Sequence, residues 1–168
     1  MNKKILVTTR SFRRINGAHQ QILRDAGYEL VNSPYQRAAT SDELREIMRD
    51  VVAVIMGLDD CSADVIQAAT QLKVISRYGV GLDSVDLDAA TAAGVVVTTT
   101  PGANALAVAE LAFGLMMALA RQIPHQDRQV RAGGWTPYTG TELSGQTLGI
   151  VGAGRIGRGC RRHPVRRT

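Results

Sequence analysis

Aromatic side chains are scarce in this sequence of 168 residues, since Phe, Trp and Tyr together make up 4%. The core must therefore be built from Ala, Val, Leu and Ile, and few rings are present on which bases could stack. Cys61 and Cys160 are the only cysteines, which excludes a disulfide framework or a four-cysteine zinc site within one chain, and we expect no metal. The apolar run after the basic start ends at Thr8, too early for a signal peptide. We therefore expect a reducing, cytoplasmic setting.

Most of the chain also lacks an excess of either charge. The formal net charge is +5 at pH 7, yet residues 158–168 alone hold 5 of the 20 basic residues and no acid. Subtracting that tail leaves 15 basic and 15 acidic residues in 1–157, a net charge of zero. Attraction to phosphates would be a property of the tail and not of the fold. We expect no nucleic-acid partner; nucleic-acid binding through the arginine tail is the alternative.

Short apolar segments alternate with amphipathic ones through the first hundred residues. The apolar segments are typical of buried strands, and they are Lys4–Thr9, Tyr28–Ser33, Val51–Gly57, Leu72–Tyr78 and Val95–Thr100. The segments between them predict helices, with a capping box at Thr40 and Glu43 and caps at Ser62 and Asp86. Strands that are apolar throughout are covered on both faces. Residues 1–100 therefore predict an α/β domain with a doubly wound, flavodoxin-like parallel sheet.

The pattern changes after Pro101. Ala103–Gln122 predicts one long apolar helix, for which a membrane span is the rival interpretation. Glu110 lies near the centre of this segment, which is costly in lipid, so we expect no membrane partner and a helix buried between domains or subunits. A further helix is predicted from Pro124 to about Ala132, and a strand over Gln146–Val151.

Two glycine-rich turns are candidate binding sites. Gly152, Gly154 and Gly157 form a GxGxxG motif directly after the predicted strand, where a pyrophosphate can sit on the amides of a helix start. The alternative is a glycine-rich turn without a ligand. The second turn, Gly79–Gly81, follows the fourth predicted strand at the edge where open α/β sheets bind ligands, and its amides suit a carboxylate. A plain strand-to-helix turn is the alternative there.

The histidines and the first cysteine are weaker candidates. His19, His125 and His163 have no carboxylate neighbour that the sequence reveals, so solvated structural roles are expected for them. Cys61 precedes a predicted helix with no partner base, and a packing role is expected for it.

Several motifs occur together in a characteristic order, namely Ser76–Asp86, Thr100–Asn104 leading into Ala109–Leu111, Gly133–Trp135 and Leu143–Gly157. With this set the chain resembles the D-isomer-specific 2-hydroxyacid dehydrogenases over residues 3–157, most closely their phosphoglycerate dehydrogenase branch. The resemblance implies a first domain that binds a 2-hydroxy acid and a second, Rossmann-type domain that binds NAD. The region 101–157 would then be a crossover helix and the start of the cofactor domain. NADP stays open as an alternative, because the position that decides between the two lies further along the family's sequences.

The resemblance also implies residue roles. Gly79, Val80 and Gly81 would hold the substrate carboxylate, with Val80 also near the nicotinamide, and Asn104 would lie on the substrate side. The glycines of the GxGxxG motif would bind the pyrophosphate, together with Arg155 and Ile156. The long helix matches the family's dimer-forming region, so a homodimer is expected of the intact family member.

The chain departs from the family in two places. Met56-Gly57 stands where phosphoglycerate dehydrogenases tend to carry an Arg-Ser pair for the substrate phosphate, which argues against a phosphorylated substrate. The family's catalytic Arg, Glu and His have no counterparts in the chain, so we expect no catalytic residue in it. We expect an N-terminal fragment whose aberrant, disordered tail over 158–168 reflects a truncated or out-of-frame gene product. Such a fragment would be inactive alone and prone to aggregate; a non-catalytic binding or regulatory module derived from the family is the alternative.

Overall fold

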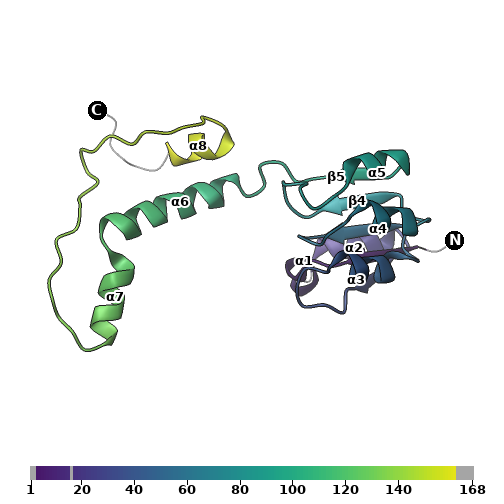
Figure 1. Cartoon of the computed structure of the whole chain (residues 1–168), viewed down its shortest axis with the longest axis horizontal. Coiled ribbons are helices and arrows are strands. Elements are labelled where there is room, and N and C mark those ends of the chain that lie inside the picture. Colours follow the sequence, from purple (N-terminus) through teal and green to yellow (C-terminus); the bar gives the residue numbers. More distant parts are fainter. Residues whose placement is uncertain (1–2, 16, 162–168) are drawn as a thin grey trace. The chain divides into compact units, whose positions relative to one another are not determined.

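The computed structural model describes residues 3–15 and 17–161, and the chain divides into two compact units, residues 1–101 and 102–168 (Figure 1). The first unit is built on a five-stranded parallel sheet with strand order β2-β1-β3-β4-β5. The strands are β1 (Lys4–Val7), β2 (Glu29–Asn32), β3 (Ala53–Met56), β4 (Val74–Arg77) and β5 (Val96–Thr98). This confirms the predicted α/β class, and the strand order is the flavodoxin-like one.

Among the described residues, five helices connect the strands of the first unit. They are α1 (Arg10–Arg14), α2 (Ala18–Asp25), α3 (Ser41–Met48), α4 (Ala63–Ala68) and α5 (Leu87–Ala92). All but α1 were predicted. The single turn of α1 contains one large apolar residue, Phe12, among four polar ones, so its sequence carries no helical periodicity.

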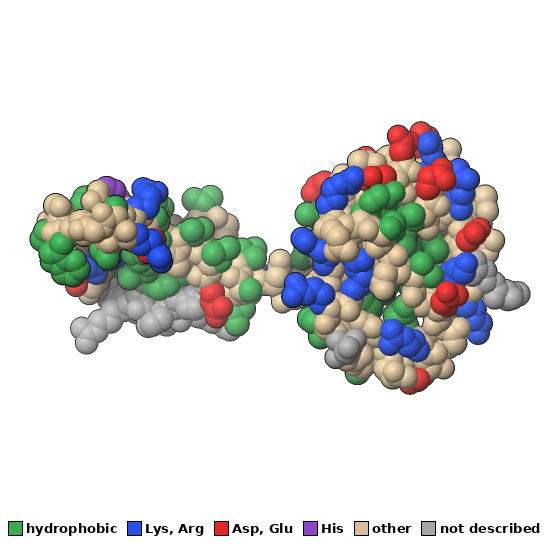
Figure 2. All heavy atoms as spheres, turned by 90° about the horizontal axis from the view of Figure 1, so that it is seen from below, with side chains coloured by type: hydrophobic (Ala, Val, Ile, Leu, Met, Phe, Trp, Pro, Cys, Tyr) green, Lys and Arg blue, Asp and Glu red, His purple; other side chains and the backbone are tan. Residues whose placement is uncertain are grey.

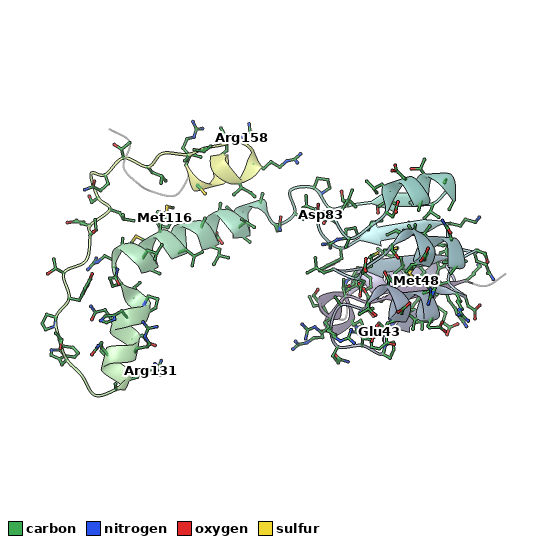
Figure 3. The ribbon with its side chains drawn as sticks, viewed as in Figure 1. Glu43, Met48, Asp83, Met116, Arg131 and Arg158 are labelled. Atoms are coloured by element: carbon green, nitrogen blue, oxygen red, sulfur yellow. The ribbon has the colours of Figure 1, made fainter. Side chains whose placement is uncertain are left out.

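Two of the three predicted helix caps are confirmed. Thr40 and Glu43 form the capping box of α3, and the Asp86 carboxylate accepts a hydrogen bond from the Ala89 amide at 2.8 Å. The predicted cap at Ser62 is wrong, because its side chain makes no capping bond and its hydroxyl oxygen instead lies 2.9 Å from that of Ser41. Hydrogen bonds from Arg37 and the Thr40 amide lower the pKa of Glu43 (Figure 3) to about 2.

The core of the first unit is aliphatic, as the scarcity of aromatics predicts. Fully buried side chains come from the strands and from the helices on them; Leu6, Leu44, Met48, Val54, Met56, Val65 and Ile75 are at most 1% exposed. Figure 3 shows Met48 among the side chains of this unit. Burying one such side chain stabilises the fold by roughly 1.5–3 kcal/mol.

The described part of the second unit contains three helices: α6 (Ala105–Ala120), α7 (Ile123–Arg131) and α8 (Arg155–Cys160). Gln122 adopts a left-handed conformation with φ 53°, and this ends the continuity between α6 and α7. The short α8 packs on α6 (Figure 1) through small residues, since a side chain at Gly159 would meet the Ala109 Cβ. Ala109 is accordingly buried, and the Cys160 thiol lies 3.9 Å from its carbonyl oxygen.

Much of the apolar surface of α6 stays exposed. Figure 2 shows hydrophobic side chains on the visible surface of the second unit, and Leu106, Leu111, Leu115 and Leu119 are each more than half exposed. Among the described residues no single helix is long and apolar enough to cross a membrane. Only α6 and α7 taken together reach that length and composition, and they bend by 61° at the break.

The predicted strand over Gln146–Val151 is wrong. These residues form no strand in the structure, and Val151 is completely exposed. A strand needs a neighbour with which to pair, and the described part of the second unit offers none. The tail predicted as disordered begins inside α8, since Arg158 and Cys160 are helical (Figure 3), and residues 162–168 lie outside the described residues.

Candidate functional site

The loop Gly79–Gly81 lies at the carboxyl end of β4 and begins two residues beyond the last strand residue, Arg77. Its ends are tied to the first unit. The Thr100 amide and hydroxyl both donate to the Gly79 carbonyl oxygen, at 2.9 and 3.1 Å. Further along, the Cys61 amide donates to the Ser84 carbonyl at 2.8 Å, so the segment between is closed at both ends and its backbone is held in place.

Gly79 occupies a position that only glycine fits. Its φ is +155°, and a Cβ there would collide with the guanidinium of Arg77. Arg77 is 7% exposed and donates from Nη1 to the Tyr78 carbonyl at 2.6 Å, while its Nε has no partner in the described part of the chain. A buried cation that pairs with no carboxylate among the described residues therefore lies directly against the loop.

The amides that follow are available to a ligand. Among the described residues, the N–H groups of Val80 and Gly81 donate to no protein acceptor, and both residues are exposed. The Asp83 carboxylate (Figure 3) lies on the Gly81 side of the loop, so the loop carries one charge of each sign. Two free amides beside a buried guanidinium can hold a small carboxylate by hydrogen bonds.

A second buried charged group, Asp59, stabilises the carboxyl edge of the sheet. The Asp59 carboxylate is 2% exposed and accepts hydrogen bonds from the Ala39 amide at 2.8 Å, the Gly57 amide at 3.0 Å and the Thr8 hydroxyl. It thereby joins the chain after β1, the chain after β3 and the segment before α3. These three segments all lie at the carboxyl edge of the sheet, where the Gly79–Gly81 loop also lies.

The position where the sequence departs from the family that it resembles is apolar in the structure. Met56 is 0% exposed and belongs to the core, so its side chain contacts no ligand. Leu58, two residues later, is 75% exposed at the same edge. Neither Met56 nor Gly57 offers a cation to a substrate phosphate.

Cys61 is buried and supports the loop through its backbone. Burial raises the pKa of its thiol to about 12, and the carboxylates of Asp60, Asp59 and Asp86 add to the rise. The thiol therefore stays protonated near neutral pH and cannot act as a nucleophile. Its predicted packing role agrees with these surroundings.

The GxGxxG turn of the second unit has the close packing of a nucleotide-binding turn. Gly152 has φ +92°, and a side chain at Gly157 would collide with the Gly152 carbonyl oxygen. Arg155 and Ile156 begin α8, and the stem of Arg155 lies against Gly102. These glycines fit the approach of a pyrophosphate to the backbone. The helix behind them is only six residues long and the segment before them is not a strand.

The predicted site residues thus fall into separate groups. Gly79, Val80 and Gly81 share one loop, and the glycines of the GxGxxG motif share one turn with Arg155 and Ile156. Asn104 stands at the N-cap of α6 in the second unit, exposed and without a capping bond. The described histidines make local contacts: the Nε2 atom of His19 lies 3.3 Å from the Phe12 carbonyl, and the ring of His125 packs on Tyr138. His163 lies outside the described residues.

Arg77 and Asp59 are the residues that sequence reasoning missed. A signal was available for Arg77, because a charged residue stands at the carboxyl end of the fourth predicted strand, directly before the glycine-rich turn. Asp59 carries no comparable signal, since it stands beside Asp60 and only burial distinguishes the two. No cluster of potential metal ligands occurs among the residues that the structure describes.

The sheet, the loop and the glycine turn agree with a comparison against protein families. Residues 5–154 match the model described as "D-isomer specific 2-hydroxyacid dehydrogenase, catalytic domain", and the chain belongs to this family. Among curated relatives it is similar to the D-3-phosphoglycerate dehydrogenase of Rattus norvegicus, with 43% identity over 141 residues that make up 83% of this chain. It is also similar to a glyoxylate reductase of Thermofilum pendens, with 46% identity over 123 residues, 69% of this chain.

Solved structures show the same relationship. The cofactor(NAD+)-bound 3-phosphoglycerate dehydrogenase of Entamoeba histolytica superposes with a TM-score of 0.74 at 30% identity, covering 96% of this chain and 50% of that one. The chain spans only 26% of the rat relative and 36% of the Thermofilum relative. It therefore corresponds to a part of each of these proteins.

Proposed function

We propose that this chain contributes the substrate-binding part of an NAD-dependent 2-hydroxyacid dehydrogenase of the phosphoglycerate dehydrogenase type. The observation that carries the proposal is the Gly79–Gly81 loop, whose amides are free and whose backbone is held by Thr100. The substrate carboxylate would accept hydrogen bonds from Val80 and Gly81, beside the Arg77 guanidinium. This arrangement would orient the carbon that bears the hydroxyl group, which is the carbon that loses or gains a hydride in this class of reaction.

The GxGxxG turn supports NAD as the cofactor, with NADP as the alternative. Gly152, Gly154 and Gly157 would let the pyrophosphate approach the backbone, with Arg155 and Ile156 at the helix start. When bound, the nicotinamide supplies the hydride acceptor. The part played by this chain is to bind and orient; the described residues place no histidine at the loop for proton transfer.

The exposed leucines of α6 support self-association. Apolar patches of this kind mark contact surfaces in soluble proteins, and a second copy of the chain would cover Leu111, Leu115 and Leu119 in a homodimer. A cytoplasmic location is proposed because Cys61 and Cys160 form no disulfide with each other.

A non-catalytic binding module is the second candidate function. The anchors of the Gly79–Gly81 loop all come from the first unit, so the loop does not depend on the second unit for its shape. A unit that binds a hydroxy acid without converting it could regulate a full-length relative by pairing with it.

The carboxylate site can be tested by following the Val80 and Gly81 amides in a nitrogen-15 NMR titration of the whole chain with D-glycerate and D-lactate. We expect saturable shifts at these two amides, and none with lactamide, which keeps the hydroxyl group but lacks the carboxylate. Gly79→Ala should abolish the shifts, because the new Cβ collides with Arg77. Gly94→Ala is the matched control, since Gly94 also has a positive φ, +66°, but its Cβ would meet no atom within 4 Å. Shifts elsewhere in the chain but not at the loop would refute the proposed site.

A further inference from the structure

We propose that the first unit binds a phosphate group, free or carried by a small organic molecule, in a cavity between Arg13 and Arg24. The cavity has a volume of about 40 Å³, where about 10–15 Å³ by the same measure accommodates one water. It lies at the carboxyl ends of β1 and β2, because Val7 and Asn32, the paired last residues of these strands, both line it. In the sheet order this is two strands away from β4 and its loop, so the site goes beyond the proposed function.

The two guanidinium groups are held in position by neutral oxygens. Arg13 donates to the Ser33 carbonyl at 2.7 Å and to the Tyr35 carbonyl at 3.4 Å. Arg24 donates to the side-chain oxygen of Gln20 at 3.1 Å. Each guanidinium has five N–H donors, so most of them are left for a ligand.

Gln20 links the two helices around the cavity. It is 6% exposed, and its amide nitrogen donates to the Phe12 carbonyl at 2.8 Å and to the Ile15 carbonyl at 3.2 Å. The same side chain accepts from Arg24, so the end of α1 and the face of α2 are fixed relative to each other. The cavity is therefore organised before any ligand arrives, which lowers the entropic cost of binding.

No negative charge compensates these arginines. Neither Arg13 nor Arg24 forms an ion pair in the described part of the chain, and no carboxylate lines the cavity. Along the sequence, residues 1–24 contain six basic residues and no acid, the first acid being Asp25. Two neighbouring cations without a counter-charge repel each other, and an anion between them would relieve that repulsion.

The charge and shape of the cavity favour a phosphate group over a carboxylate. Two guanidinium groups from different helices present two forks and a total charge of +2, while a phosphomonoester carries roughly −1.5 to −2 at neutral pH. A planar carboxylate pairs with one guanidinium group and neutralises one of the two charges. A tetrahedral oxyanion can accept from both arginines at once, and from the amide of Asn32 at the rim.

The site can be tested on the whole chain by NMR of the arginine Nε–H groups during titration with inorganic phosphate and, separately, with glycerol 3-phosphate at constant ionic strength. We expect saturable shifts at Arg13 and Arg24 with either probe, and none at Arg45, which is paired with Asp42. Tighter binding of glycerol 3-phosphate would identify an organic phosphate as the ligand, and equal binding would identify the free ion; either result supports the site. The absence of saturable shifts, or binding of acetate as tight as that of phosphate, would overturn it.

A charge-matched pair of variants separates a specific site from general attraction. Arg24→Gln removes one fork and should weaken phosphate binding about tenfold or more, as expected for loss of a charge-assisted pair. Lys73→Gln removes the same charge at an exposed position just before β4, at the amino ends of the strands and so away from the cavity. It should leave the affinity for phosphate within about twofold. Equal weakening in both variants would overturn the proposal. Because the titration of the unmodified chain is independent of any variant, a folding defect in Arg24→Gln does not remove the test.

Discussion

Replacing Asp59 by alanine is expected to destabilise the first unit strongly, although Asp59 belongs to no helix or strand. Its carboxylate is 2% exposed and accepts from two backbone amides and the Thr8 hydroxyl. The Gly57 amide has a second acceptor in the Thr8 oxygen at 3.1 Å, so it keeps one partner in the variant. The Ala39 amide and the Thr8 hydroxyl lose theirs.

The size of the effect follows from these two orphaned donors. A hydrogen bond to a charged group contributes about 1.5–3 kcal/mol, so two such losses amount to about 3–5 kcal/mol in the free energy of unfolding once the relieved burial of the charge is allowed for. Since domains are stable by about 5–15 kcal/mol in total, the variant should lie near the limit of folding. The loop after β3 would also lose its attachment to the segment before α3.

Asp60→Ala is the matched control, because Asp60 is the adjacent acid and is exposed. Among the described residues its carboxylate accepts only from the Ser41 hydroxyl, at 2.8 Å. Its loss should cost at most about 1 kcal/mol. Urea unfolding followed by far-UV circular dichroism measures both, because the only tryptophan lies in the second unit and does not report on the first. If the two variants differ by less than about 1 kcal/mol at equal m-values, Asp59 does not tie the edge of the sheet together as argued.

Three further predictions concern the thiols, the long helix and catalysis. In the native chain at pH 8 the thiolate fraction of Cys61 is about 10⁻⁴, from a pKa of about 12, so Ellman's reagent should label Cys160 and reach Cys61 only in urea. Because burial raises the pKa of Cys61 in the folded state, this thiol also contributes to the free energy of unfolding. That contribution is lost as the pH rises from about 9 to 12, and comparison with Cys61→Ala measures it. The exposed leucines of α6 should drive association that sedimentation detects and Leu115→Glu reduces, and a monomer at all concentrations would exclude this. A polypeptide of these 168 residues should form no NADH from D-2-hydroxy acids. Proton transfer by a positioned acid–base group contributes about 10²–10⁴-fold to the reaction rate, and no described histidine is placed for it. Turnover would show that the acid–base group lies elsewhere in the chain.

The first unit was largely predictable because its strands are apolar throughout and its helices have capping residues. All five observed strands, such as Lys4–Val7, lie within the strand ranges predicted from the sequence. They are shorter than those ranges because strand pairing stops earlier. The capping box at Thr40 and Glu43 is local chemistry that needs no tertiary context. The helix α1 was missed because RSFRR has no periodic apolar pattern; its position depends on Gln20 and Phe12, which are contacts that no local pattern reveals.

In the second unit, local sequence patterns are not sufficient to predict the structure. The apolar run over 147–151 is as good a strand sequence as β4, yet it forms no strand, because strand formation depends on a partner with which to pair. The GxGxxG turn keeps its tight geometry even so, since that geometry follows from glycine backbones and local contacts such as that between Gly152 and Gly157.

The same contrast explains why the carboxylate loop and the glycine turn differ as candidate sites. The Gly79–Gly81 loop is held by the paired strand β4, by hydrogen bonds from Thr100 after the neighbouring strand β5, and by the hydrogen bond from the Cys61 amide to the Ser84 carbonyl. Its free amides therefore stay oriented without a ligand. The glycine turn has the right local shape but no sheet behind it. Preorganised donors bind an anion with less loss of entropy than donors that must be ordered first. Binding of a hydroxy acid by this chain should therefore be easier to detect than binding of a dinucleotide, and the two ligands test the two units separately.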